Sequence, residues 1–481
     1  MSNVDGAVPT PPPTANTDAV AIMGLDLQAG KTVPRRRVIA WAFWDWATQP
    51  FNTVLLTFVW VPSFLTSYFF LDPDVAASGI VGDKRLDCDT AANAATAYCG
   101  GLGNLAAQLG WGVTAAGILI LLLAPVLGQR ADRAGHQKLQ LGIFTGLLVL
   151  TQFLMFFVDG MPAYFWFGVT LIAAGSVFGE IAAVSNNALL VSVSTPRNVG
   201  KVSGLGWGFG YLGGIIFLAI VVACILSGVL DGTDPMTFRI VGLAAAIWTL
   251  VFAIPILVSV PEPPKFADAQ PTGFFRSYVE LVRSIMRLWR DARHTFWFLL
   301  ASAVYRDGLS AVFTFGAVIA GHVFGFGFTD LVIFGIVLNV VAGVSTILAG
   351  RLDDHFGPKP VILFTIAGLV VCCLTVFFGA ALGSGLFWAA GIVLAAFVGP
   401  AQAASRSFLA RVTPAGQEGE IFGLYATTGR AAGWMASLLW SVFIVLAANQ
   451  TLYGILGIAL VLAVGFVLLC FVKAPARVSA E

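Results

Sequence analysis

Charged residues are scarce in this sequence: lysine, arginine, aspartate and glutamate make up 11% of its 481 residues, whereas 58% are hydrophobic. Soluble proteins carry about twice that charged fraction, so a soluble globular protein is excluded. The formal net charge is only +1, which leaves no basic face for a nucleic acid. Apolar runs of about 20 residues, the length of a helix that crosses a bilayer, recur along the chain. We therefore expect a polytopic protein whose surroundings are the lipid bilayer.

Motifs for nucleotide and metal chemistry are missing as well. The stretch "GLGWGFGYLGG" follows no strand and precedes no Lys-Ser or Lys-Thr pair, so it is not a phosphate loop and ATP is not an expected energy source. Its small-residue spacing indicates close helix packing instead. The six cysteines show no metal-ligand spacing. We therefore expect no metal, no other cofactor and no enzymatic activity.

The apolar runs predict an all-α membrane protein with twelve spanning helices. Their expected ranges are 38–70, 110–129, 139–158, 162–193, 201–228, 238–260, 295–323, 328–350, 360–381, 385–412, 419–447 and 451–472. The one long polar loop, residues 71–108, follows the first helix and holds Cys88 and Cys99. A disulfide between these two cysteines and a pair of free thiols are both open, because the outcome depends on whether that side is oxidising.

The basic residues predict the orientation in the membrane. Twenty lysines and arginines lie in the two tails and in the loops of one side, whereas the other side has only Lys84, Arg85 and Arg239. Cytoplasmic loops carry the excess of basic residues. Both termini are therefore expected to be cytoplasmic, and the loop of residues 71–108 to be external.

A weak internal repeat predicts two similar halves. "GQRADRAGHQK" from Gly128 matches "GRLDDHFGPKP" from Gly350, and "GKVSGLGWGFGYLGG" from Gly200 matches "GEIFGLYATTGRAAG" from Gly419. Either match could arise by chance, but both keep the same order along the chain at nearly the same offset. A parallel repeat of this kind places two bundles of the same orientation around a central cavity.

The repeat sets the expected domain organisation. Residues 38–260 and 295–473 form two six-helix bundles, joined by a cytoplasmic linker, residues 261–294, that contains an amphipathic helix on the membrane surface. Residues 1–37 are rich in Pro, Ala and Thr and lack a hydrophobic signal core, which predicts a disordered cytoplasmic tail. Residues 474–481 form a second short cytoplasmic tail.

The segment "GQRADRAGHQK" after the second predicted helix resembles the cytoplasmic signature of the major facilitator superfamily. The matching segment "GRLDDHFGPKP" after the eighth helix is a second, weaker copy. The resemblance implies a twelve-helix transporter fold in which Asp132 and Arg133 latch the cytoplasmic helix ends. His136 and Gln137 replace the usual Arg or Lys, so a weaker latch is expected. The predicted gating-loop residues are Gly128, Asp132, Arg133 and Gly135 in the first copy, and Gly350, Asp354 and Gly357 in the second.

Longer motifs narrow the resemblance to one branch. "WAFWDWATQPF", "NNALLVSVSTP", "VSGLGWGFGYLGG", "FLLASAVYRDG" and "AQAASRSFLARVTP" together look like the vacuole-effluxer-like group. That group contains autophagy-linked amino-acid effluxers of fungal vacuoles and bacterial relatives. The resemblance runs from the first to the eleventh helix and implies amino-acid efflux. It also implies a bacterial plasma (inner) membrane, with a vacuolar membrane as the alternative location.

A few polar and charged side chains lie deep in the predicted spans. An ionised carboxylate at the centre of a bilayer costs roughly 2.5 to 3.5 kcal/mol on insertion scales, so such residues face a cavity or a partner and indicate a transport pathway. In the superfamily, helices 1, 4, 7 and 10 line the cavity, and most of these charges lie on or beside them. The predicted substrate-binding residues are Trp41, Trp44, Asp45, Trp46, Gln49, Asn52, Asn187, Tyr305, Arg306, Asp307, Gln402, Ser405 and Arg406.

The residue types in this set suit a zwitterion. Asp45 between Trp44 and Trp46 suits an ammonium group, through ion pairing and cation–π attraction. Arg406 or Arg306 suits a carboxylate, through a bidentate hydrogen bond. The alternative for Asp45 is a purely structural pairing with an arginine or a helix end.

Protons are a candidate coupling ion. A carboxylate buried in the membrane can take up and release a proton in each transport cycle, and Glu180 is the first candidate because no basic residue lies near it in the sequence. Asp45 and Asp307 are further candidates, and interhelical hydrogen bonding is the alternative role for Glu180. The histidines map to loops or helix ends, so a histidine relay is not expected.

The function expected from the sequence is secondary transport of a small polar organic solute, preferably an amino acid or related zwitterion. The protein is expected to act as a monomer by alternating access of its two halves. A drug, organic-cation or sugar porter is the alternative within transport. A receptor or scaffold that transports nothing is the alternative of another class, and the two cytoplasmic motifs argue against it.

Overall fold

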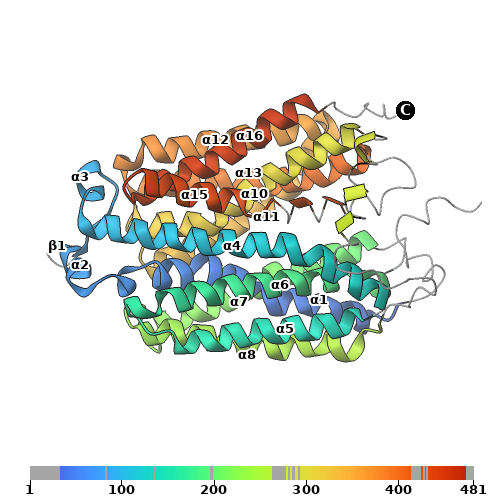
Figure 1. Cartoon of the computed structure of the whole chain (residues 1–481), viewed down its shortest axis with the longest axis horizontal. Coiled ribbons are helices and arrows are strands. Elements are labelled where there is room, and N and C mark those ends of the chain that lie inside the picture. The colour runs from blue at the N-terminus through green and yellow to red at the C-terminus, as the bar shows by residue number, and fades with distance from the viewer. Residues whose placement is uncertain are drawn as a thin grey trace, which may run out of the picture.

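The computed structural model of the chain describes residues 33–81, 84–134, 136–194, 199–262, 278–279, 282–283, 286, 288–290, 293–412, 424–425, 428–429 and 432–472. Long helices run side by side along the longest axis of the molecule (Figure 1). The short elements α2 (Pro73–Ser78), α3 (Ala91–Ala94) and β1 (Ile80–Val81) lie at one end, which we call the loop end. The start of α1 lies at the opposite end.

Ten helices in the described part of the chain are long and apolar enough to cross a membrane. Each of them overlaps one of the ranges predicted from the apolar runs. They are α4 (Ala97–Ala134), α5 (Gln137–Leu154), α6 (Phe165–Val193), α7 (Val199–Leu226), α8 (Pro235–Ser259), α10 (Arg293–His322), α11 (Phe328–Phe356), α12 (Pro358–Phe378), α13 (Ser384–Val412) and α16 (Gly454–Phe471).

Two further helical segments stand where the first and eleventh spans were predicted. The first is α1 (Arg35–Pro50), which continues as the π-helical segments η3 (Phe51–Phe58) and η4 (Val61–Leu65). Its hydrogen-bond pattern changes directly after Pro50, because proline has no N–H group and its ring crowds the preceding turn. The second is α15 (Met435–Leu446), which follows a turn at residues 432–434 and is shorter than a full span.

The second spanning helix begins earlier than predicted. α4 starts at Ala97, whereas the apolar run predicted a start at residue 110 and a loop up to residue 108. The glycine-rich segment before residue 110 is helical in the structure, and Gly101 and Gly103 in it allow close packing. A Cβ atom on Gly103 would lie 1.4 Å from the Asn449 carbonyl oxygen. Small residues let helix backbones approach in this way.

The remaining elements are short and connect or extend the helices. β1 pairs with β2 (Lys84–Arg85) in an antiparallel ladder, with Ile80 opposite Arg85. The short 3-10 helices are η5 (Tyr68–Phe70), η6 (Met155–Phe157), η7 (Pro162–Tyr164), η8 (Ala380–Leu382) and η9 (Thr451–Tyr453). In the predicted linker, the described residues between 278 and 290 are helical, and the rest of the predicted amphipathic helix lies outside the described residues.

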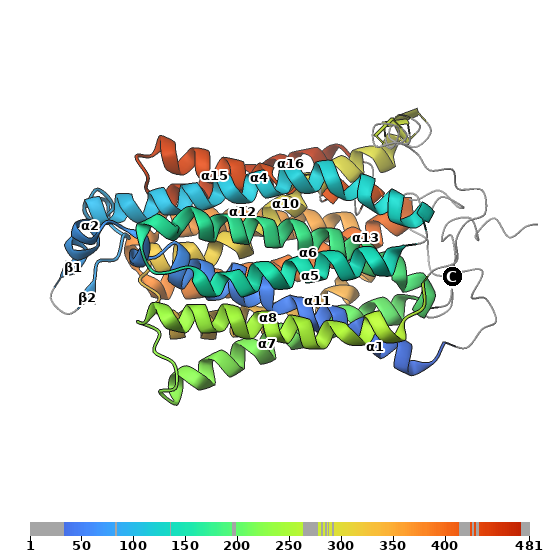
Figure 2. The ribbon, with the colours of Figure 1, turned by 60° about the horizontal axis from the view of Figure 1, so that its bottom comes forward.

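The helices of the second half repeat the packing of the first. In the first half, α6 packs against α4 and α5, α8 against α5, and α1 against α7 and α8. In the second half, α13 packs against α11 and α12, α16 against α12, and α10 against α15 and α16. Figure 2 shows α1, α7 and α8 together on one side and α15 and α16 on the other, with α4 alongside them.

The two halves meet closely toward the loop end. The Trp440 indole on α15 donates a hydrogen bond to the Ala106 carbonyl of α4 (3.1 Å), and the Ser441 hydroxyl donates to the Ala107 carbonyl (2.9 Å). Phe328 of α11 packs edge-on against Phe238 of α8, with ring centroids 5.7 Å apart. Large apolar side chains such as Phe364 and Phe378 are exposed on the outer surface, as the surface of a bilayer-embedded protein requires.

Candidate substrate site

Asp45 lies half-buried on α1, against the glycine-rich face of α7. A Cβ atom on Gly206 would lie 2.7 Å from Asp45 Oδ2 and 2.7 Å from the Trp41 ring. A Cβ atom on Gly210 would lie 3.5 Å from the Asp45 Cβ. Because Gly206 has no Cβ atom, the Asp45 carboxylate and the Trp41 ring can both pack against α7 at this point.

The Asp45 carboxylate has no hydrogen-bond or ion-pair partner among the residues that the structure describes. α7 runs unbroken from Val199 to Leu226, so the amides that face Asp45 are already used within that helix. Burying a carboxylate without a partner is costly. Such a group is suited to receive its partner from a ligand.

The three neighbouring tryptophans of α1 point to different helices. Trp41 lies beside Asp45 and donates its indole N–H to the Asn186 carbonyl of α6 (2.9 Å). Trp44 is buried and donates to the Thr145 hydroxyl of α5 (3.0 Å). Trp46 stacks on Trp248 of α8, with ring centroids 5.7 Å apart. The structure thus brings Trp41 to the carboxylate and packs Trp44 and Trp46 into helix contacts.

The polar stripe of α1 continues towards the loop end. The Gln49 amide donates to the Thr53 hydroxyl (3.1 Å), and Gly214 of α7 leaves room for both side chains. Asn52 is exposed on η3, a segment that contacts α7 of the first half and α10 and α11 of the second. The segment η3 therefore lies between the two halves, and Asn52 is an exposed residue of it.

On α6, Glu180 is half-buried and takes part in a polar interaction within the chain. Asn187, two turns further along the same helix, is exposed. Neither residue is a hydrogen-bond or ion-pair partner of Asp45 in the described part of the chain.

Arg306 on α10 contacts Tyr425, in the segment that precedes α15. Its guanidinium donates to the Tyr425 carbonyl (3.1 Å) and lies 4.1 Å from the centroid of the Tyr425 ring. A guanidinium has five N–H donors, so this contact leaves several of them for a further acceptor.

The next residue, Asp307, is buried and bonded to α15. Its carboxylate accepts a hydrogen bond from the Ala436 amide (2.7 Å) in the first turn of α15. The first four amides of a helix have no partner within the helix, and Asp307 satisfies one of them. Unlike Asp45, Asp307 therefore has a partner within the protein.

Tyr305 and Ser405 join α10 to α13. Their hydroxyl oxygens lie 2.6 Å apart and both side chains are fully buried. Gln402 is half-buried on α13. The Arg406 side chain lies outside the described part of the structure.

The predicted gating-loop residues are also largely outside the described part. Only the backbone is described for Gly128, Asp132, Arg133, Gly350 and Asp354, and nothing is described for Gly135. Gly357 has φ +84° before Pro358 begins α12, a conformation that favours glycine.

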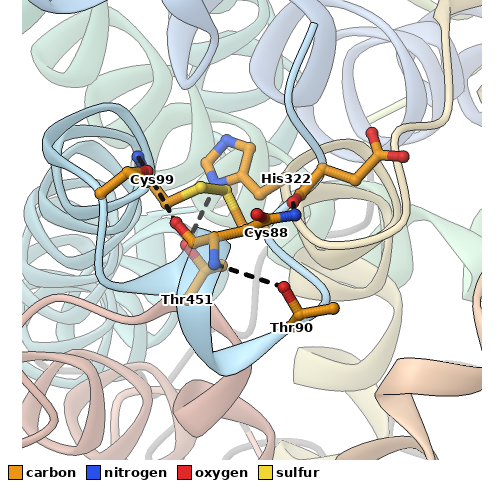
Figure 3. Close-up of a disulfide and its surroundings, with 8 residues drawn as sticks. Cys88, Thr90, Cys99, His322 and Thr451 are labelled. Atoms are coloured by element: carbon orange, nitrogen blue, oxygen red, sulfur yellow. Dashed lines mark hydrogen bonds between the residues drawn. A yellow bond between two sulfur atoms is a disulfide. The ribbon is translucent and has the colours of Figure 1, made fainter. Parts of the chain in front are cut away.

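Cys88 and Cys99 form a disulfide in the structure, with Cα atoms 5.8 Å apart. It ties the loop to the first turns of α4 and lies close to the end of α10 (Figure 3).

Three residues that contact predicted site residues were not predicted from the sequence to lie in the site: Gly206, Tyr425 and Ala436. The spacing of Gly206, Gly210 and Gly214 by four residues, which places them on one helix face, was the available signal for the first. The other two depend on where α15 begins, which the apolar run did not reveal.

The fold, together with the sequence relatives, defines a membrane transporter of the major facilitator type. The profile of the family "Vacuole effluxer Atg22 like" matches residues 192–478, and the chain belongs to this family. It is 28% identical over 438 residues to the uncharacterized MFS-type transporter YxiO of Bacillus subtilis (strain 168), covering 90% of this chain and 94% of that protein. The protein is therefore an integral membrane protein.

More distant matches agree on the fold. Autophagy-related protein 22 of Coccidioides immitis (strain RS) is 25% identical over 281 residues, which is 52% of this chain and 44% of that protein. A D-xylose–proton symporter superposes with a TM-score of 0.65 at 13% identity, covering 93% of this chain and 98% of that one. A nucleoside transporter superposes with a TM-score of 0.59 at 14% identity, covering 91% and 100%. The structural likenesses show the fold alone.

Proposed function

We propose that this protein is a secondary active transporter of a small polar organic solute, preferably an amino acid or a related zwitterion. The observation that carries the proposal is the Asp45 carboxylate. It is half-buried in the first helix of the bundle, lies beside Trp41 and has no partner among the described residues. An ammonium group would supply a positive charge next to the Asp45 carboxylate and would also lie against the indole ring of Trp41.

An arginine on the opposite half would take the carboxylate of the substrate. Arg306 keeps N–H donors beyond the one that binds the Tyr425 carbonyl, and two parallel N–H groups fit a carboxylate. Arg406 on α13 is the second candidate for this role. Placing the ammonium site on α1 and the carboxylate site on α10 or α13 makes binding depend on both halves.

The proposed architecture has twelve membrane crossings and cytoplasmic termini. In this architecture, α1 with η3 and η4 forms the first crossing, and α15 with the residues before it forms the eleventh. The distribution of lysine and arginine between the two sets of loops supports this orientation. Residues 38–260 and 295–473 are the two bundles that rock about the site, in a protein that acts as a monomer.

We further propose that protons drive the transport. Asp45, Glu180 and Asp307 are the candidate coupling groups, since each is a carboxylate within a helix of the bundle. We also propose that a latch formed by Asp132 and Arg133 closes the pathway at its cytoplasmic end.

Solute uptake by liposomes that contain the purified protein tests this function. Radiolabelled amino acids, betaines, sugars and organic cations are supplied with and without a proton gradient. We expect saturable uptake of a zwitterion that is lost in Asp45→Asn and kept in Asp74→Asn, a control at an exposed loop carboxylate. Uptake of organic cations alone would replace the amino-acid proposal by the cation-porter alternative, which the Trp41–Asp45 pair also favours. Uptake of no solute of any class would contradict the transport proposal.

A further inference from the structure

A buried histidine, His322, joins the two halves at the loop end. His322 is the last residue of α10, and its side chain is 3% exposed. Its Nε2 lies 2.5 Å from the Thr66 carbonyl oxygen of the first half, just after η4. Its Nδ1 lies 3.2 Å from the hydroxyl of Thr451, which begins η9 in the second half. The ring therefore spans the boundary between the two halves.

The partners fix the form of the ring. A carbonyl oxygen can only accept, so Nε2 carries the proton and donates to Thr66. In a neutral imidazole Nδ1 is then an acceptor, and the Thr451 hydroxyl donates to it. Thr66 is completely buried where a helical segment ends, and its carbonyl has no partner further along that helix. The histidine thus satisfies a group that would otherwise be buried without a partner.

The disulfide-bonded loop covers this contact. The Cys88 amide donates to the His322 carbonyl (3.2 Å), and Asp87 lies against Gly325 in the turn that follows α10. The disulfide to Cys99 holds Cys88 to the first turns of α4. Figure 3 shows the His322 ring next to the disulfide, with a dashed line from the ring to Thr451. One segment of the first half is thus anchored on the helix end of the second half.

We propose that His322 is the latch of a gate at the loop end, and that the loop tied by Cys88 and Cys99 is its cover. This inference rests on the proposed function, because alternating access requires the two halves to separate at this end in one state of the cycle. Separation moves Thr66 away from the ring and breaks the hydrogen bond that joins the two halves. The His322 contacts therefore favour the state in which this end is closed.

Access of a thiol reagent to the space between the halves tests the latch without any substrate. The four free cysteines, Cys224, Cys372, Cys373 and Cys470, are replaced by alanine and the disulfide is kept. Asn52→Cys then reports access, because Asn52 is exposed on η3 between the halves. A membrane-impermeant maleimide is added to intact cells from the side of the disulfide loop.

We expect His322→Ala to speed labelling of Asn52→Cys about tenfold, the effect of a lost buried hydrogen bond on an equilibrium. Thr451→Val keeps the shape of the side chain and removes only its hydroxyl, so a smaller increase of about threefold is expected even if the alanine variant does not fold. His294→Ala, at the exposed opposite end of the same helix, is the matched control and should leave labelling unchanged.

Unchanged labelling in both His322→Ala and Thr451→Val would overturn the latch. If His322→Ala yields no folded protein, unchanged labelling in Thr451→Val alone overturns it. Faster labelling in a protein that transports none of the tested solutes would support the latch and contradict the proposed substrate class. Slower labelling in either variant would also overturn the proposal, because it would mean that the contacts hold the gate open.

Discussion

Asp45 and Asp307 are carboxylates on the first helix of each half, yet their surroundings differ. Each lies on the first helix of its half, on α1 and α10 respectively. Asp307 is 4% exposed and accepts a hydrogen bond from the Ala436 amide. Asp45 is half-buried and has no partner among the described residues. The different surroundings of the two carboxylates are the reason why we propose different roles for them.

The difference comes from the neighbouring helix. α15 begins at Met435, so its first amides face Asp307 and need an acceptor. α7 passes Asp45 without a break, so its amides are already bonded, and its glycines offer space instead of a donor. The break before α15 therefore gives Asp307 a hydrogen-bond donor, whereas the continuous glycine face of α7 gives Asp45 space, which we propose a ligand fills.

Filling the space beside Asp45 should have the largest effect. In Gly206→Leu the new side chain occupies the position of the Asp45 carboxylate and the Trp41 ring, so we expect more than about a 100-fold loss of solute affinity, or about 2.7 kcal/mol. Gly208→Leu on the same helix is the control, because a Cβ atom there meets nothing within 4 Å. Isothermal titration of both purified variants measures the effect. Equal affinities would place the site elsewhere.

Removing the Asp307 carboxylate should destabilise the fold rather than weaken binding. Asp307→Ala leaves the Ala436 amide buried without an acceptor, which costs about 2–3 kcal/mol. Asp307→Asn keeps a carbonyl oxygen at the same place and should recover most of that loss. Chemical denaturation in detergent compares the two variants. An alanine variant as stable as the parent would contradict the structural role.

A new donor beside Asp45 should make it resemble Asp307. A Cβ atom on Gly210 fits without overlap, 3.5 Å from the Asp45 Cβ, so Gly210→Ser can present a hydroxyl to the carboxylate. A neutral hydrogen bond contributes about 1 kcal/mol, so solute affinity should fall about fivefold. Gly210→Ala supplies the same Cβ without the hydroxyl. Equal affinities in the serine and alanine variants would show that Asp45 does not gain from a partner.

The smallest expected effect concerns the aromatic neighbour. Trp41→Phe keeps a ring beside Asp45 and loses the indole N–H that binds the Asn186 carbonyl, so we expect a two- to threefold weaker affinity for a cationic or zwitterionic solute (about 0.5 kcal/mol). Trp44→Phe loses a similar bond to Thr145, away from the carboxylate, and should not change the affinity. The same titration compares them, and a larger loss in Trp44→Phe would reverse the assignment.

Much of the helix layout could be predicted because an apolar run of spanning length has few alternatives in a membrane. The start of α4 was misplaced because glycine-rich sequence suggests a loop, whereas Gly103 packs against Asn449. The π-helical turns after Pro50 and the break before Met435 depend on hydrogen bonding that hydropathy does not report.

The site could be predicted in residue type but not in arrangement. Charged residues stand out in apolar runs, so Asp45 and Asp307 were both visible. Their separate roles depend on α7 and α15, which lie far away in the sequence. Residues next to Asp45 in the chain point about 100° away around the helix, whereas Trp41, four residues earlier, shares its face. That periodicity explains why Trp41 rather than Trp44 or Trp46 lies beside the carboxylate.

Thermal unfolding with added solutes tests the central claim, that Asp45 is reserved for a ligand and Asp307 is not. A ligand at 100 times its Kd stabilises the folded protein by about 2.7 kcal/mol. We predict that a zwitterionic solute raises the melting temperature of the parent and of Asp307→Asn, and that this rise disappears in Asp45→Asn. A rise that persists in Asp45→Asn and disappears in Asp307→Asn would contradict the account.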